Sequence, residues 1–451
     1  MKKPMRLSLR LQIRNFKNSF LQVGELPFVN LLPDTLIKAI RLSGNTYETV
    51  FTPLVTLKAF LLQVLSETGC CKEAVSQVLT ERVSNGYEAN SMNTGPYCKA
   101  RKRLPLTLLK EAVTSSAQAL NQQASESWLW KGFQVALVDG TTLLMPDTQD
   151  NQKTYPQQST QKAGLGFPIV RMVGLLSLSA RCCIGYATAP YQGKGTGETS
   201  LFSQLIEMLG AKDLLLADRF YTSYAIMVML MEQETAFVFR QSANTKTDFR
   251  KGQRLGAKDH IICYKKPKRK PVWMSKEDYE KLPGEVLIRE FAVNGTVYVT
   301  SLMDTKKYPK KTLAELYSKR WNIELDFRTI KTHMGMEMLR CKTAEMIDKE
   351  IAVNLLAYNL TCGNIAQSAY ANDKEPRHIS FMATVQLMRR IVGLCMTMTG
   401  KTLKILLPSL LKAISSTEVG RRKRPNQPRV IKRRPKPFPL MTKPRCEYVK
   451  G

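Results

Sequence analysis

The sequence predicts an α/β protein in which a mixed sheet is flanked by helices. One observation is a set of apolar, β-branched runs typical of buried strands, at residues 133–145, 213–220, 236–241 and 296–302. A second is the pair of helix-like segments 197–209 and 223–234, which alternate with those strands. A third is the helical spacing of apolar residues before and after this region.

Residues 1–130 are expected to form a compact helical domain that binds DNA. Thr52 can cap a helix whose first residue is Pro53. A basic cluster next to Tyr97 suits contact with phosphates, although a solvated helix face explains it equally well. The cluster comprises Lys99, Arg101, Lys102 and Arg103.

Residues 131–241 are expected to form the first part of a sheet domain. Segment 167–191 is predicted to give two antiparallel neighbouring strands. The apolar strand 135–138 leads to Asp139, and the strand that starts at residue 213 ends at Asp218. A β-rich insertion is predicted for 242–295, where short strand-like runs are interrupted by Lys and Pro, and the sheet domain resumes over 296–416 with C-terminal helices.

The charge of the chain indicates a polyanionic partner. The 68 Lys and Arg residues outnumber the 37 Asp and Glu residues, which gives a formal net charge of +31. Nucleic acid fits best, because each neutralised phosphate releases counterions. Residues 417–451 form a predicted basic extended tail: 420–445 is rich in Lys, Arg and Pro and has no acid, so we expect a DNA-binding arm, with a solvated tail as the alternative. No run of about 18 apolar residues and no signal peptide is recognisable, so we expect a cytoplasmic protein.

Cysteine and histidine usage favours carboxylate chemistry. The 10 cysteines include no C-x-x-C pair, and we expect them to be reduced thiols, most of them packing residues. With only 3 histidines, neither a zinc site nor a Ser-His or Cys-His mechanism is favoured. Carboxylates prefer Mg²⁺ or Mn²⁺.

Segment 316–331 is predicted to be one amphipathic helix with two stripes. The core stripe comprises Leu316, Ile323, Phe327, Ile330 and Met334. A second stripe at its rim comprises Tyr317, Arg320, Glu324, Arg328 and Lys331, and the opposite side, with Glu315, Asp326 and His333, is expected to face solvent. Glu324 is therefore either a ligand or part of i,i+4 ion pairs with Arg320 and Arg328.

Three carboxylates are expected to meet at one edge of the sheet. Asp139 and Asp218 follow neighbouring strands, and the helix could bring Glu324 to the same point. Singly, each has a simpler explanation: a turn at Asp139-Gly140, a solvated strand end at Asp218 and an ion pair at Glu324. Together they could hold two divalent cations roughly 3.5–4 Å apart, as in phosphoryl transfer.

These residues resemble the signature of a known family. Tyr317, Arg320, Glu324 and Lys331 fit Y-x2-R-x3-E-x6-K, which is similar to the YREK motif of the insertion-sequence-4 family of DDE transposases. "VDGTT" around Asp139 and "ADRFYT" around Asp218 are similar to its two other acidic motifs. The resemblance extends over most of the chain.

The resemblance implies a ribonuclease-H-like catalytic domain, interrupted by the insertion. It implies metal-dependent nicking and strand transfer at the inverted-repeat ends of a mobile element, with Asp139, Asp218 and Glu324 as ligands of two Mg²⁺ or Mn²⁺ ions. Tyr317, Arg320 and Lys331 would hold phosphates of the end. Trp273 is a candidate to stack on a flipped base, although a packed core tryptophan is equally plausible. The partners implied are double-stranded element-end and target DNA, held by a homodimer at the bacterial nucleoid.

Two other classes of protein share parts of these features. A non-catalytic DNA-binding derivative of such an element would need only the basic arm and the N-terminal helices. A structure-specific nuclease on the same fold would share the carboxylates and differ in strand joining.

Overall fold

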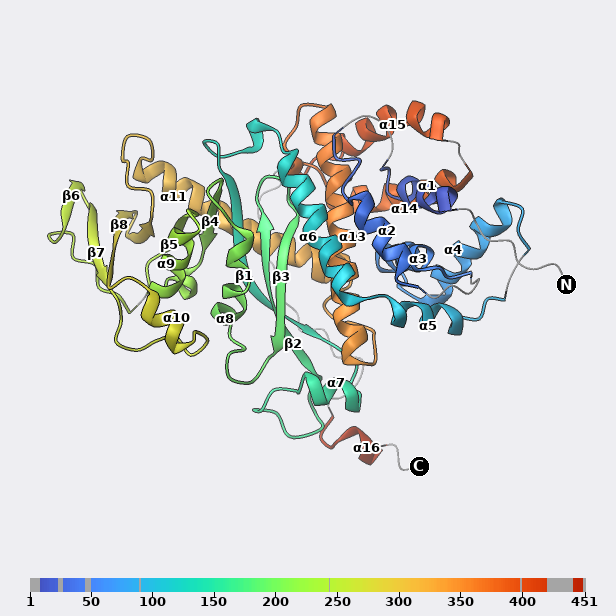
Figure 1. Cartoon of the computed structure of the whole chain (residues 1–451), viewed down its shortest axis with the longest axis horizontal. Helices are drawn as coiled ribbons and strands as arrows, with labels where there is room; N and C mark the ends of the chain where they lie inside the picture. The colour runs from blue at the N-terminus through green and yellow to red at the C-terminus, as the bar shows by residue number, and fades with distance from the viewer. Residues whose placement is uncertain are drawn as a thin grey trace, which may run out of the picture.

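A mixed sheet crosses the molecule in the computed structural model, which describes residues 9–22, 27–44, 50–88, 91–242, 244–397, 400–419 and 441–448 (Figure 1). Within these residues the sheet has nine strands in the order β3-β2-β1-β4-β5-β9-β8-β7-β6. The strands are β1 Gln134–Leu144, β2 Ile169–Ser177, β3 Cys183–Pro190, β4 Asp213–Ala217, β5 Ala236–Arg240, β6 Gln253–Gly256, β7 Asp259–Lys265, β8 Glu285–Val293 and β9 Thr296–Thr300.

The first five strands have the ribonuclease-H-like arrangement. β1, β2 and β3 pair as antiparallel neighbours, and β4 and β5 run parallel to β1 on its other side. The antiparallel pairing predicted for segment 167–191 is therefore confirmed, as is the fold class. The sequence suggested that Asp139 lies at a strand end or in a turn. In the structure it lies within β1, because β1 continues alongside β2 to Leu144.

Each face of the parallel strands is covered by helices, as buried parallel strands require. On β4, Leu214 and Leu216 point into one core, whereas Leu215 and Ala217 point into the other. The first core contains residues of α6 (Leu106–Gln122), α12 (Asn322–Arg328) and α13 (Ala344–Ala371). The second contains residues of α8 (Glu198–Ser203) and α9 (Tyr224–Glu232).

The segment between β5 and β9 extends the same sheet. β8 pairs with β9 through a tight turn at Asn294-Gly295, both at positive φ, and β7 and β6 follow outward. The guanidinium of Arg289 is fully buried, lies 2.8 Å from Asp259 and donates to the carbonyls of Leu302 and Tyr308. These bonds tie the segment to the chain that leads into α11 (Lys310–Ser318).

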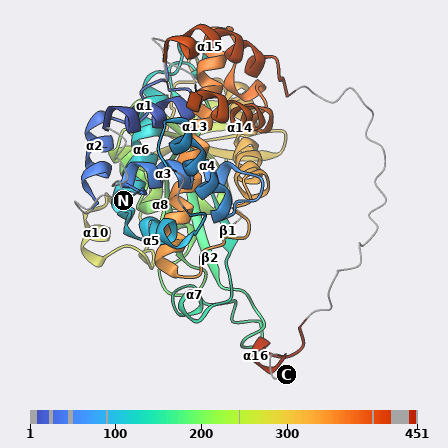
Figure 2. The same cartoon turned by 90° about the vertical axis from the view of Figure 1, so that its right-hand side faces the viewer.

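Helices from both ends of the chain share one core. Figure 2 shows α1–α4 beside α14 and α15, and Figure 1 shows α13 running between these helices and the strands β1–β3. Thr52 caps α3 as predicted, through a bond from the amide of Val55. The bounds of these helices are α1 Leu9–Ser19, α2 Asp34–Leu42, α3 Pro53–Leu65, α4 Cys71–Ser84, α5 Gly95–Arg103, α14 Phe381–Thr397 and α15 Gly400–Ser415; the short helices are α7 Gln149–Thr154, α10 Lys276–Lys281 and α16 Arg445–Tyr448.

The C-terminal arm, the cysteines and the absence of a membrane helix were also predicted from the sequence. Most of the basic arm, residues 420–440, lies outside the described residues. The eight described cysteines with placed side chains are free thiols, as predicted. In the described part of the chain, no helix is both long and apolar enough to cross a membrane.

Candidate active site

Asp139 and Asp218 occupy equivalent positions on neighbouring parallel chain segments, just beyond the end of β4. The parallel register pairs Leu137 with Leu216, so two residues further on each chain reaches its aspartate. Asp218 caps a short 3-10 turn, and its carboxylate accepts from the amide of Phe220 at 2.7 Å. The carboxylate of Asp139 accepts from the amide of Gly140 at 2.8 Å. The two predicted aspartates are thus brought together.

Glu324 reaches the same place from the first turn of α12. The predicted single helix is in fact a series of turns: α11, a 3-10 turn Lys319–Trp321, α12 and a π-helical turn Thr329–His333. Ile323, Phe327 and Ile330 are buried as predicted. Phe327 lies so close to Gly174, the strand partner of Asp139, that a Cβ there would meet its ring at 3.1 Å. This close packing brings α12 against β1 and Glu324 to the aspartates.

Arg320 lies between two of the three carboxylates. Its guanidinium nitrogens are 3.6 Å from Asp139 Oδ2 and 3.4 Å from Glu324 Oε1. Burial raises the pKa of Asp139, and the Gly140 amide and Arg320 oppose that rise, whereas the negative charges of Asp218 and Glu324 add to it. The pKa of Asp139 therefore reports on the proximity of all three acids.

Tyr317 and Lys331, also predicted as site residues, are half-buried. Tyr317 packs edge-on against Tyr298 with ring centroids 5.1 Å apart. Burial raises the pKa of Tyr317 to about 12, with Arg320 opposing the rise and the charge of Asp218 adding to it. Lys331 is in the π-helical turn beyond α12.

The predicted solvent-facing side of the helix is wrong for Asp326. Its side chain is fully buried, 3.2 Å from Arg181 Nε and 2.9 Å from Arg377 Nη2. Arg377 also donates to the carbonyls of Ser177 and Leu178. Asp326 therefore anchors α12 through a second buried side of the helix. Glu315 and His333 are exposed as predicted.

Trp273 lies on the segment before α10. It is half-buried and packs against a cluster that includes Tyr224, Met274 and Tyr279. Two aromatics that the sequence analysis did not single out are more exposed and adjoin the site residues in sequence: Phe220 at 67% and Trp321 at 59%.

Sequence reasoning also missed Glu198 and Tyr221. The negative charges of Asp139 and Asp218 help to raise the pKa of Glu198, after burial, and Arg171 opposes this rise. Burial first, and then the charges of Glu198, Asp139 and Asp218, hold the pKa of Tyr221 well above its usual range. The only signal in the sequence was position: Glu198 lies in the segment before β4, and Tyr221 lies just after Asp218.

The oxygen ligands at this site fit a hard divalent cation by their chemistry. As they stand, no three His, Cys, Asp or Glu side chains among the described residues are grouped closely enough to hold one. The guanidinium of Arg320 lies where two of the carboxylates face each other.

The basic cluster of α5 is only partly available to a partner. Arg101 is buried, with its guanidinium over the rings of Phe60 and Tyr97, so it supports the helix core rather than contacting phosphate. The other members of the cluster, Lys99, Lys102 and Arg103, are exposed.

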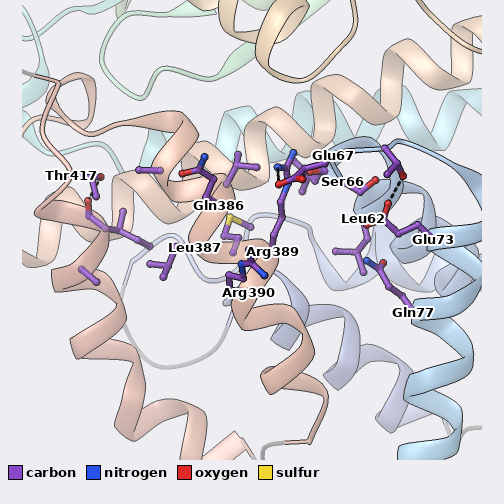
Figure 3. A pocket seen from close by; sticks show the side chains of 17 residues that line it. Leu62, Ser66, Glu67, Glu73, Gln77, Gln386, Leu387, Arg389, Arg390 and Thr417 are labelled. Atoms are coloured by element: carbon purple, nitrogen blue, oxygen red, sulfur yellow. Dashed lines mark hydrogen bonds and ion pairs between the residues drawn. The ribbon is translucent and has the colours of Figure 1, made fainter.

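A separate pocket of about 750 Å³ lies between α3, α4, α14 and α15 (Figure 3). Arg389 crosses it, with its guanidinium 3.4 Å from Glu67. None of the three carboxylates lines this pocket, so it is distinct from the candidate active site.

Comparison with known proteins identifies the family of this chain. Residues 130–360 match the model of the transposase DDE domain family. The transposase InsG for insertion sequence element IS4 of Escherichia coli K12 is 28% identical over 360 residues, which cover 76% of this chain and 78% of InsG. InsZ of the same bacterium is 24% identical over 139 residues, 30% of this chain and 44% of InsZ.

A solved structure of the piggyBac transposase synaptic complex with hairpin DNA covers 88% of this chain and 85% of that one, at 8% identity and a TM-score of 0.43. That likeness is too weak to support an inference about this chain.

The ribonuclease-H-like strand order and the matched domain together define a transposase. The chain belongs to the DDE transposase family, and the resemblance to the insertion-sequence-4 group is confirmed. It is an enzyme of DNA transposition, and that family depends on divalent metal ions.

Proposed function

We propose that this transposase nicks the inverted-repeat ends of an insertion sequence and joins them to target DNA, using Asp139, Asp218 and Glu324 as metal ligands. The observation that supports this most directly is the meeting of the three acids from β1, the end of β4 and α12. Two bound Mg²⁺ or Mn²⁺ ions would supply Lewis-acid stabilisation of the attacking and leaving oxygens.

The side chains around the carboxylates would position the DNA. Arg320 has a forked guanidinium suited to a phosphate, and in a DNA complex it would exchange its carboxylate partners for the phosphate of the element's end. Tyr317 and Lys331 would hold neighbouring phosphates. Arrival of the DNA would thereby strengthen the binding of the cation by Asp139 and Glu324, which the DNA-free protein already holds more weakly.

Trp273 is proposed to stack on a base flipped out of the end. Its packing on the Tyr224 cluster would leave one part of the indole for such a contact. Replacing Trp273 with Ala should reduce the fluorescence change of a 2-aminopurine placed at the end; an unchanged signal would assign the base to another aromatic.

The proposed partners are the two ends of the element and the target duplex. Since two ends must be cut and joined together, a homodimer on the DNA is proposed, acting in the bacterial cytoplasm at the nucleoid. The basic tail 417–451 would add phosphate contacts.

A cleavage and joining assay on DNA carrying the element's ends tests this function. Nicking and joined product should require Mg²⁺ or Mn²⁺ and disappear with a chelator. Full activity in excess chelator, or with Zn²⁺ alone, would contradict the carboxylate site. Nicks without any joined product would point to a nuclease, and binding without nicks to a non-catalytic derivative.

A further inference from the structure

Glu198 lies against the backbone of the first aspartate motif. A Cβ built on Gly140 would come within 2.3 Å of Glu198 Cδ and 2.4 Å of its Oε1. The glycine beside Asp139 is therefore what allows the glutamate to approach. Asp139 and Gly140 are successive strand residues and face opposite sides of the sheet, so Glu198 comes from the side of α8 and Glu324 from the side of α12.

The carboxylate of Glu198 has no structural partner. It is half-buried, yet within the described chain it takes part in no hydrogen bond and no ion pair. Arg171, the nearby cation, instead donates to the carbonyl of Thr196. A partly buried carboxylate without a partner, under the repulsion of Asp139 and Asp218, lowers the stability of the fold. Such a group is expected where a cation compensates it.

An independent observation is the hydroxyl of Tyr221. The side chain of Tyr221 is fully buried, and among the described residues its hydroxyl has no hydrogen-bond partner. The ring stands edge-on to Phe202, one helical turn after Glu198 on α8, with centroids 5.4 Å apart. The charges of Glu198, Asp139 and Asp218 all act on this hydroxyl. A buried donor among acids suits a water or ligand shared with them.

We propose that Glu198 is a fourth acidic ligand of the active site, which binds the divalent cation from the face of the sheet opposite to Glu324. This inference rests on the proposed metal-binding role of Asp139. Gly140 is then required for its small size, because any side chain there would displace the Glu198 carboxylate. Tyr221 would orient a water at the same cation.

Metal binding by the full-length protein without DNA tests the proposal. Mn²⁺ is titrated and its free ion is followed by electron paramagnetic resonance. Glu198→Gln removes the charge at almost constant size, and Gly140→Ala leaves the charge but displaces it. Both should weaken Mn²⁺ binding by roughly 10–100-fold. The control is Glu207→Gln, an exposed acid just beyond α8, which should bind like the wild type.

The thermal unfolding of metal-free protein separates a ligand from a packing residue. Glu198→Gln should be at least as stable as the wild type without metal and should gain less from added Mn²⁺; lower metal-free stability with an unchanged Mn²⁺ gain would overturn the proposal. The Asp139→Asn variant distinguishes an error about Glu198 from an error about the whole carboxylate site. If Asp139→Asn loses Mn²⁺ and Glu198→Gln does not, only the role of Glu198 is wrong. If both bind normally, the proposed carboxylate site itself is wrong.

Discussion

The guanidinium of Arg320 lies 3.6 Å from the carboxylate of Asp139, a residue on a strand far away in the sequence. The same side chain also makes the i,i+4 contact with Glu324 that the sequence suggested as an alternative to metal binding. The ion pair is therefore present in the structure, and in the proposed function it gives way when the DNA binds.

Replacing Arg320 with Ala should weaken binding of the element's end by about tenfold or more, because a charge-assisted phosphate contact is worth roughly 1.5–3 kcal/mol. Nicking and joining should slow together. Arg320→Lys keeps the positive charge but lacks the forked guanidinium, so its affinity for the end should fall between those of Arg320→Ala and the wild type. Gel-shift titrations measure the effect; equal affinity of all three proteins would remove Arg320 from the DNA contact.

Replacing Glu324 with Gln should abolish nicking while leaving binding of the end nearly intact. The amide keeps the size and hydrogen-bonding capacity of the side chain but lacks the charge that holds a cation. Gel shift and cleavage are measured on the same DNA. Nicking at a near wild-type rate would return Glu324 to a purely structural ion pair.

The raised pKa of Asp139 predicts the pH dependence of the metal-free protein. Because burial disfavours its ionised form, the folded state binds more protons than the unfolded state between the ordinary and the raised pKa. The contribution of Asp139 to stability therefore falls as pH rises through this window. In chelator at neutral pH, Asp139→Asn should melt above the wild type, and the difference should shrink on acidification. A mutant that melts lower at neutral pH would contradict this.

Replacing Asp326 with Ala should destabilise the fold by roughly 3–5 kcal/mol, because it leaves the guanidiniums of Arg181 and Arg377 without their buried partner. Urea denaturation measures the change. Glu315→Ala, an exposed acid on α11, is the control and should change stability by about 0.5 kcal/mol or less. If Asp326→Ala lowered the stability as little as Glu315→Ala does, the buried ion pairs would not anchor α12.

Deleting residues 420–451 should weaken DNA binding and flatten the slope of log affinity against log salt, because each lost phosphate contact removes counterion release. Fluorescence anisotropy over a range of salt concentrations measures the slope. A lower affinity with an unchanged slope would mean that the tail acts other than through phosphates.

The sequence by itself determined the strands, the fold class and the spacing that puts Arg320 and Glu324 on one stripe. The strand propensity of a segment and the helical spacing of its apolar residues are local properties. They can therefore be recognised without knowing which other segments pack against it. The buried stripe of Ile323, Phe327 and Ile330 was predicted for the same reason. The domain boundaries and the roles of the site residues stay predictions.

Only the tertiary structure decided which polar residues are enclosed. Asp326 looked solvated because a helical period identifies one apolar face, whereas its partners Arg181 and Arg377 come from a strand connection and a late turn. Glu198 was not singled out from the sequence, and only its contact with Gly140 places it next to the first aspartate motif. Burial and charge proximity depend on which distant segments meet, and no local pattern in the chain encodes that.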